Sequence, residues 1–280
     1  MLVNMNTVLR HAEEKQCCIG AFDTPNLEIL MAVIRAAEKR NEPVIIQHAQ
    51  LHEPEMPIRI IGPIMVRMAK ESSVPVCVML DHGEDMEYVK TALDLGFSAV
   101  MYDGSSKPYE ENVRMTKEVV ALAKEYGANV EAEIGIVTGH EGREFAIQDV
   151  SEAYTDPELA ARYVKETGID ALAASVGTVH GFYATKPKLD FERIEKIKEL
   201  TGVPLVMHGG SGISVEDTQH AIRCGIRKIN YFSYMSNAGV RGVKKLLEEK
   251  EVKYFHDLAN AAVDAMEEDV LSAMAMFALE

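Results

Sequence analysis

The sequence contains no uninterrupted apolar run that approaches the roughly 18 residues needed for a membrane-spanning helix. Its four cysteines, Cys17, Cys18, Cys77 and Cys224, show no Cys-x-x-Cys spacing. We therefore expect neither a disulfide framework nor a cysteine-based zinc site. The N-terminal stretch lacks the apolar core of a signal peptide, so we expect a cytoplasmic protein that does not associate with membranes.

An excess of basic residues is also missing. The 29 Lys and Arg residues face 44 Asp and Glu residues, which gives a net charge of −15. This acidity argues against a nucleic-acid partner. No linker rich in proline or serine divides the 280 residues. We predict one domain over residues 1–280, because α/β barrels run as single domains at about 250 residues.

Eight short apolar segments are present, and each is followed by an amphipathic helical pattern. The segments are 18–23, 43–48, 76–81, 99–103, 129–134, 171–176, 204–208 and 227–231. The helical patterns cover 27–40, 58–71, 86–95, 110–126, 157–167, 191–200, 215–224 and about 235–249. Eight such units predict an α/β fold, a (β/α)8 TIM barrel, with an extra C-terminal helix over about 252–277. A doubly wound sheet is the alternative, but it needs fewer strands or a second domain.

Three histidines follow three different apolar segments. His82, His180 and His208 all come where a predicted strand ends. The carboxyl ends of barrel strands meet at one rim, where catalytic groups gather. Imidazoles with carboxylates nearby suit Zn²⁺, and three protein ligands leave a position open for substrate.

Three carboxylates belong to the same predicted rim. Asp81 directly precedes His82, so it is placed to orient or deprotonate a hydroxyl group near the metal. Asp103 and Glu133 are predicted either to form a second metal position or to hold the histidine ligands from behind.

Glycine-rich turns follow the last three predicted strands. They contain Gly181, Gly209, Ser211 and the stretch from Asn230 to Ser233. Barrels commonly bind phosphate at the loops after the seventh and eighth strands. Glycine lets backbone N–H groups approach an anion closely. These turns therefore predict a phosphate site beside the histidines.

The order of these motifs resembles the class II, metal-dependent ketose-bisphosphate aldolases of the fructose- and tagatose-bisphosphate type. The resemblance spans nearly the whole chain. The motifs are Leu-Asp-His-Gly at 80–83, Asp-Gly-Ser at 103–105, Glu-Ala-Glu-Ile-Gly at 131–135, Gly-Thr-Val-His-Gly at 177–181, His-Gly-Gly-Ser-Gly at 208–212 and Lys-Ile-Asn at 228–230.

The resemblance implies a lyase that reversibly cleaves a phosphorylated ketose, expected to be a bisphosphate, to dihydroxyacetone phosphate and an aldehyde. The reaction would pass through a metal-stabilised enediolate. His82, His180 and His208 would bind the catalytic Zn²⁺, and Asp81 would transfer the proton of the aldehyde-side hydroxyl. Glu141, in the long connection between residues 135 and 154, would handle the donor proton.

The same resemblance implies further ligands and partners. A second divalent ion would lie near Asp103 and Glu133, and Na⁺ or K⁺ near the phosphate. The donor phosphate would be bound by Gly181, Gly209, Ser211, Asn230 and Ser233. The chain would form a homodimer or homotetramer.

The sequence departs from the family pattern around the substrate pocket. Asp23 replaces a usual Asn, Phe232 replaces a smaller residue, and residues 47–53 replace a Ser or Thr followed by small residues. We therefore expect retained chemistry on an altered substrate. Asp23, His48, His52 and Glu53 are candidate specificity residues on the acceptor side, with ordinary loop roles left open.

Two other functions remain open from the sequence. Three histidines and an aspartate could activate water in a metal-dependent hydrolase on the same barrel. A non-catalytic sugar-phosphate-binding homologue is the other, and the departures at Asp23 and Phe232 favour it.

Overall fold

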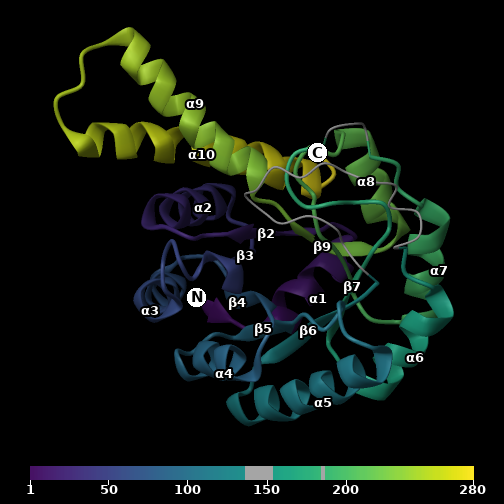
Figure 1. Cartoon of the computed structure of the whole chain (residues 1–280). Helices are drawn as coiled ribbons and strands as arrows, with labels where there is room; N and C mark the ends of the chain where they lie inside the picture. Colours follow the sequence, from purple (N-terminus) through teal and green to yellow (C-terminus); the bar gives the residue numbers. More distant parts are fainter. Residues whose placement is uncertain (136–153, 184–186) are drawn as a thin grey trace.

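The computed structural model describes residues 1–135, 154–183 and 187–280, which form a closed parallel barrel surrounded by helices (Figure 1). The barrel strands are β2 (Ile19–Asp23), β3 (Val44–Ala49), β4 (Val76–Gly83), β5 (Ala99–Tyr102), β6 (Asn129–Ile134), β7 (Ala171–Ala174), β8 (Leu205–Met207) and β9 (Ile226–Asn230). Each strand pairs with its neighbour in sequence, and β9 pairs with β2 to close the ring. The predicted TIM barrel is confirmed.

Helices follow the strands at nearly the predicted positions. They are α2 (Leu27–Arg40), α3 (Ile58–Glu71), α4 (Met86–Asp94), α5 (Tyr109–Tyr126), α6 (Pro157–Thr167), α7 (Phe191–Thr201), α8 (Val215–Cys224), α9 (Ser233–Glu249) and α10 (Phe255–Phe277). A short 3₁₀ turn, η1 (Gln50–His52), follows β3. None of the described helices is long and apolar enough to cross a membrane.

Local sequence explains where these helices begin and end. The side chains of Asn26, Asp85 and Asp156 each accept a hydrogen bond from a backbone N–H group in the first turn of α2, α4 and α6. Gly127 and Gly168 end α5 and α6 in the left-handed conformation, which costs glycine little.

One helix was not anticipated from the sequence. α1 (Met5–Lys15) follows a two-residue strand, β1 (Leu2–Val3), and packs across the barrel end where the strands begin. Its buried side chains are Met5, Val8, Leu9 and Ala12. They join the inward-facing apolar residues Ile19, Ala21, Ile45, Cys77, Met79, Ala99, Met101, Ala171, Ala173 and Val206. The barrel interior is therefore apolar at this end, and its polar side chains lie toward the other.

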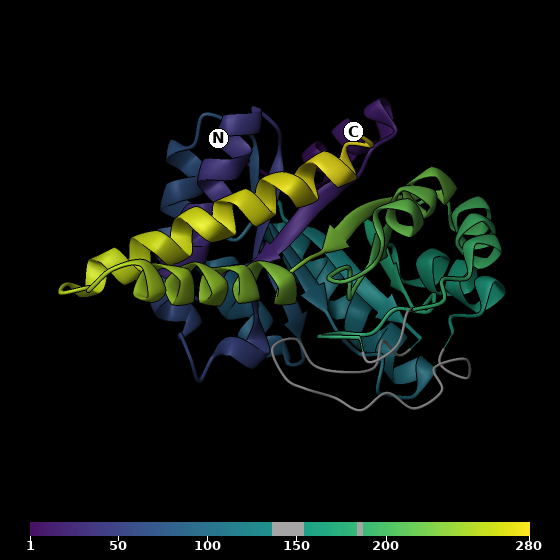
Figure 2. The ribbon, with the colours of Figure 1, turned by 90° about the horizontal axis from the view of Figure 1, so that it is seen from above.

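The last two helices form an arm. α9 and α10 lie side by side and extend beyond the barrel (Figures 1 and 2). Gly242 of α9 allows the close approach, because a Cβ atom there would lie 2.6 Å from the carbonyl oxygen of Ala261 on α10.

Candidate metal and catalytic site

The end of β4 turns two consecutive side chains toward the same space. Successive residues of a regular strand point to opposite faces. His82 instead has a φ of 42°, in the left-handed region, and the pairing of β4 with β5 shifts register between Leu80 and Gly83. Asp81 Oδ2 consequently lies 3.8 Å from His82 Nε2. Such backbone strain is concentrated at functional sites, where the rest of the fold holds it in place.

The three predicted histidines come together at the strand ends. His82 Nε2 lies 2.9 Å from His208 Nδ1, and His180 Nε2 lies 3.4 Å from the same atom. His82, His180 and His208 form one of the groups of potential metal ligands in the described part of the chain.

Carboxylates behind two of the rings decide which nitrogens carry protons. His82 Nδ1 lies 2.7 Å from Asp103 Oδ2, and His208 Nε2 lies 3.1 Å from Glu131 Oε1. A carboxylate only accepts, so each of these nitrogens donates. The opposite nitrogens, His82 Nε2 and His208 Nδ1, then face each other with lone pairs at 2.9 Å. Two facing lone pairs repel each other unless a cation, either a proton or a metal ion, lies between them, and this donor set fits Zn²⁺.

The electrostatics of the cluster also favour a cation. Burial lowers the pKa of His82, but the carboxylates of Asp81 and Asp103 outweigh it and raise that pKa to about 10. Burial and the neighbouring His82 hold the pKa of His208 well below its usual value. The carboxylates therefore stabilise positive charge at this end of the barrel, carried either by a proton on His82 or by a metal ion bound to the histidines.

The predicted carboxylate pair stays together, because His82, Asp103 and Glu133 form another group whose potential ligand atoms lie within 4.8 Å of one another. Asp103 is fully engaged, since Oδ2 accepts from His82 and Oδ1 accepts from Ser105 Oγ at 2.6 Å. It therefore holds His82 from behind. Glu133 is buried, and its Oε2 lies 3.9 Å from His208 Nδ1, closer to where a ligand would bind.

Sequence reasoning did not select two residues that complete this site. Glu131 and Lys228 stand within two of the sequence motifs, which by themselves assign neither residue a role. Both side chains are fully buried inside the barrel, and Lys228 Nζ lies 3.0 Å from Glu131 Oε2. The strand period of two was the available signal, because Lys228 shares the inward face with Asn230, and Glu131 shares it with Glu133.

Asp81 is held at one oxygen and open at the other. Its Oδ1 accepts from Asn230 Nδ2 at 3.1 Å. Its Oδ2 has no hydrogen-bond partner among the described residues, although it is buried. The carboxylate is therefore oriented, with one oxygen left to exchange a proton with a ligand.

The glycine-rich turns after β7, β8 and β9 lie against one another. Gly209 has a φ of 65°, and a Cβ atom there would lie 2.1 Å from the Val179 carbonyl oxygen, so only glycine fits. Ser211 Oγ accepts from the N–H group of Phe232 at 3.2 Å, which joins the β8 turn to the start of α9. Phe232, the residue before α9, provides no side-chain cap, and the Tyr234 N–H group in the first turn lies 3.5 Å from Ser211 Oγ, so an anion at this helix end would lie beside Ser211.

Two predicted phosphate residues differ in placement. Gly181, with a φ of 90°, follows His180 directly and lies in the β7 turn. Asn230 points its side chain into the barrel, to Lys228 and Asp81, and only its carbonyl oxygen, which accepts from Gly210 N at 3.0 Å, touches the turn.

Three of the four candidate acceptor-side residues lie together, since the ring of His48 lies 6.3 Å from that of His52 and Tyr88 joins His48 to Glu53. His52 is buried over the strand ends, with its ring 5.3 Å from that of Phe232. Asp23 is buried at the end of β2, paired in register with Gln47. His48 lies on the same face of β3 as Val44 and Ile46, which is the outer face of the barrel. Burial there lowers the pKa of His48 to about 4.

Glu53 has a local structural contact. Its Oε2 accepts from the N–H group of Ile58, at the start of α3, and from the Tyr88 hydroxyl at 2.6 Å. Tyr88 in turn lies 3.2 Å from His48 Nε2. Glu141 lies outside the described residues.

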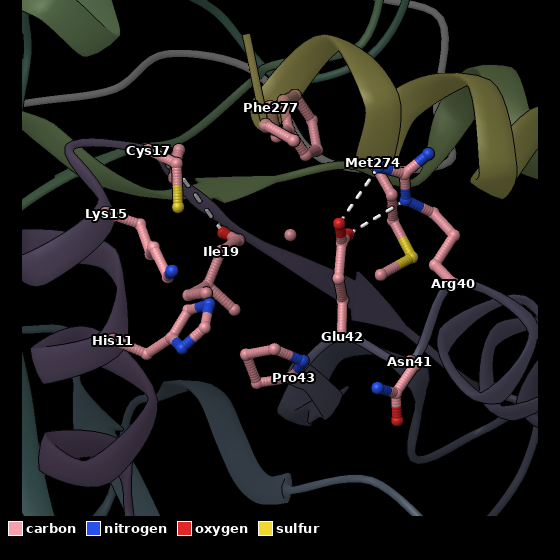
Figure 3. A pocket seen from close by; sticks show the side chains of 13 residues that line it. His11, Lys15, Cys17, Ile19, Arg40, Asn41, Glu42, Pro43, Met274 and Phe277 are labelled. Atoms are coloured by element: carbon pink, nitrogen blue, oxygen red, sulfur yellow. Dashed lines mark hydrogen bonds and ion pairs between the residues drawn. The ribbon is translucent and has the colours of Figure 1, made fainter. Parts of the chain in front are cut away.

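A cavity of about 380 Å³ lies at the other end of the barrel (Figure 3). His11 and Lys15 of α1 face Arg40, Glu42 and Phe277 across it. Arg40 is already paired with Glu42 at 2.8 Å. The cavity opens where β2 and β3 begin and takes no part in the histidine site.

Comparison with known proteins identifies related chains along the whole length. The family model for "Fructose-bisphosphate aldolase class-II" matches residues 3–280. A fructose-bisphosphate aldolase of Geobacillus stearothermophilus is 40% identical over 285 residues, covering 99% of this chain and 96% of the relative. The crystal structure of the YdjI aldolase from Escherichia coli K12 superposes with a TM-score of 0.88 at 35% identity, covering 99% of this chain and 97% of that one. The structure of a putative fructose-1,6-bisphosphate aldolase from Coccidioides immitis superposes with a TM-score of 0.85 at 32% identity, covering 98% of this chain and 96% of that one.

Proposed function

We propose, since this chain belongs to the class II fructose-bisphosphate aldolase family, that it reversibly cleaves a phosphorylated ketose to dihydroxyacetone phosphate and an aldehyde. The observation that carries the proposal is the histidine cluster beside a buried carboxylate with one open oxygen. The family relationship disfavours both the hydrolase and the non-catalytic alternatives. Residues 1–280 are proposed to form one catalytic domain.

The family is zinc-dependent, and His82, His180 and His208 would hold the ion. A bound Zn²⁺ would supply Lewis-acid polarisation of the donor carbonyl, which stabilises the negative charge left on the donor when the carbon–carbon bond breaks. Asp103 and Glu131 fix the orientation of His82 and His208. A second divalent ion near Asp103 and Glu133 and a Na⁺ or K⁺ ion near the phosphate stay predictions.

Asp81 would move the proton on the acceptor side. In the cleavage direction, its open Oδ2 takes the proton from the hydroxyl group that becomes the aldehyde oxygen. Asn230 keeps the carboxylate aimed at that hydroxyl by donating to Oδ1. Glu141 is proposed to exchange the donor proton, on the resemblance alone.

The donor phosphate and the acceptor aldehyde would contact different turns at the strand ends. Gly181, Gly209, Ser211 and Ser233 are proposed to bind the donor phosphate through backbone N–H groups and the start of α9. His52 and Asp23 are proposed to contact the acceptor. His48 and Glu53 would act through Tyr88, which contacts both.

A panel of ketose phosphates tests the reaction and its acceptor. We expect dihydroxyacetone phosphate to be released from at least one ketose 1-phosphate or bisphosphate, measured through NADH oxidation by glycerol-3-phosphate dehydrogenase. His48, His52 and Glu53 stand where the family usually has small residues, and burial keeps both imidazoles neutral. Fructose 1,6-bisphosphate should therefore not be the fastest substrate. Its cleavage at the highest rate of the panel would refute the altered acceptor, and no release from any member would count against the aldolase proposal.

The arm of α9 and α10 is proposed to form a homodimer or homotetramer interface. It exposes Val240, Leu247, Tyr254 and Phe255, the last with 79% of its surface exposed. Light scattering should give two or four times the 31.0 kDa chain mass. Phe255→Glu should lower that mass, whereas Leu159→Glu, on exposed α6, should not. A monomeric wild type would contradict this proposal. A cytoplasmic location stays a prediction of the sequence.

A further inference from the structure

We infer that Lys228 is a positioning residue that fixes both the histidine cluster and Asp81, and this inference rests on the proposed function. Lys228 lies on β9 with none of its surface exposed. Lysine is almost never fully buried unless it is paired. Its Nζ lies 3.1 Å from Glu131 Oε1, 3.0 Å from Glu131 Oε2 and 2.7 Å from Asn230 Oδ1. The ammonium group thus has oxygen acceptors from two strands inside the barrel.

The first branch runs to the histidines. Glu131 Oε1 accepts from both Lys228 Nζ and His208 Nε2, each at 3.1 Å. The positive charge of Lys228 holds the buried carboxylate in place. Because Glu131 accepts from His208 Nε2, the proton of the neutral ring stays on that nitrogen. His208 Nδ1 then faces His82 and His180.

The second branch runs to Asp81. An ammonium group only donates, so Lys228 requires the oxygen end of the Asn230 carboxamide to face it. The NH₂ end must then point away, where it donates to Asp81 Oδ1 at 3.1 Å. Without Lys228 the amide is held at its nitrogen end alone, by Asp81, and its oxygen loses the donor that fixes its position. Lys228 therefore selects the rotamer of Asn230 that orients Asp81.

Together the contacts form one chain from His208 through Glu131, Lys228 and Asn230 to Asp81. All five side chains are at most 1% exposed. Lys228 does not contact the open oxygen of Asp81 or the facing nitrogens of the histidines. It acts on the reaction through the two residues it binds.

Four variants separate positioning from simple charge compensation. Lys228→Met leaves Glu131 as an unpaired buried charge, so its melting temperature and zinc affinity should both fall. Glu131→Gln instead leaves the Lys228 ammonium as an unpaired buried charge, so its melting temperature and zinc affinity should fall as well. The double variant Lys228→Met/Glu131→Gln removes both charges, and the Gln oxygen can still accept from His208. It should regain the fold and bind zinc within about tenfold of wild type, in the range of an altered outer-shell partner.

The double variant should still turn over slowly. Asn230 lacks its donor there, so it holds Asp81 less firmly, and we expect kcat to stay about a hundredfold below wild type, the cost of a misplaced catalytic group. KM should change little, because none of the exchanged atoms touches substrate. Arg227→Met is the matched control. Arg227 is the adjacent cation on β9, but it binds Glu13 and Gln16 at the apolar end of the barrel. Its kcat and zinc affinity per folded molecule should equal wild type.

The outcomes decide between the two roles. A double variant with wild-type kcat would overturn the inference, because Lys228 would then only neutralise Glu131. Lys228→Met with the zinc affinity of Arg227→Met, measured by chelator competition, would overturn the histidine branch. That second readout needs no turnover, so it remains valid even if wild type cleaves no ketose, a result that would instead defeat the proposed function.

Discussion

Asp81→Asn should lower kcat for ketose cleavage by about 10²–10⁴-fold, the usual contribution of a positioned general acid or base. Asparagine keeps the shape of the side chain but cannot accept the hydroxyl proton at physiological pH. The histidine cluster does not depend on Asp81 for its facing nitrogens, since Asp103 and Glu131 orient the rings. Zinc content should therefore stay at the wild-type level, and steady-state kinetics with metal analysis checks both.

Asp85→Asn is the matched control for this change. Asp85 is exposed at the start of α4, where its side chain caps the helix, and asparagine caps equally well. It should leave kcat unchanged. Asp81→Asn should also retain hydrogen exchange on dihydroxyacetone phosphate, because Asp81 acts on the aldehyde side. A kcat within threefold of wild type would remove Asp81 from the reaction.

His180→Ala should abolish both cleavage and tight zinc binding. The three rings each direct a nitrogen at the same point, and losing one leaves two protein ligands where a catalytic zinc site has three. We expect zinc affinity to fall by more than about a hundredfold, since loss of an outer-shell partner alone costs about 10–100-fold. Competition with a chelator measures the affinity, and kcat is followed at a zinc concentration that saturates wild type.

His220→Ala controls for the loss of an imidazole. His220 is exposed on α8, and its ring stacks on Phe191 with centroids 3.9 Å apart, away from the strand ends. Its zinc affinity and kcat should match wild type. An unchanged zinc affinity in His180→Ala would mean that another residue completes the site.

The barrel could be predicted from sequence because its strands are buried on both faces. Continuous apolar runs between capped amphipathic helices leave few other arrangements. α1 escaped the prediction because only one narrow side of it is apolar, and its partners lie on six different strands. Such non-local packing has no signature within the segment itself.

The site could be predicted in part for a similar reason. His82, His180 and His208 each follow a strand, so barrel geometry alone brings them to one rim. The roles of Lys228 and Glu131 depend on which way adjacent strands face and on hydrogen-bond register across the barrel. His48 was a candidate for the substrate pocket, but it does not face the barrel interior. It is adjacent to Gln47 on β3, so its side chain points to the opposite face of the strand, toward the helices.

The central claim is that the histidine cluster and its surrounding residues activate dihydroxyacetone phosphate as the donor. The most direct measurement is hydrogen exchange at its hydroxymethyl carbon in D₂O, followed by NMR with and without a chelator. It requires no knowledge of the aldehyde. The account predicts exchange that the zinc-loaded protein catalyses and that chelation abolishes. Zinc-loaded protein that catalyses no exchange, or exchange that survives complete removal of the metal, would contradict it.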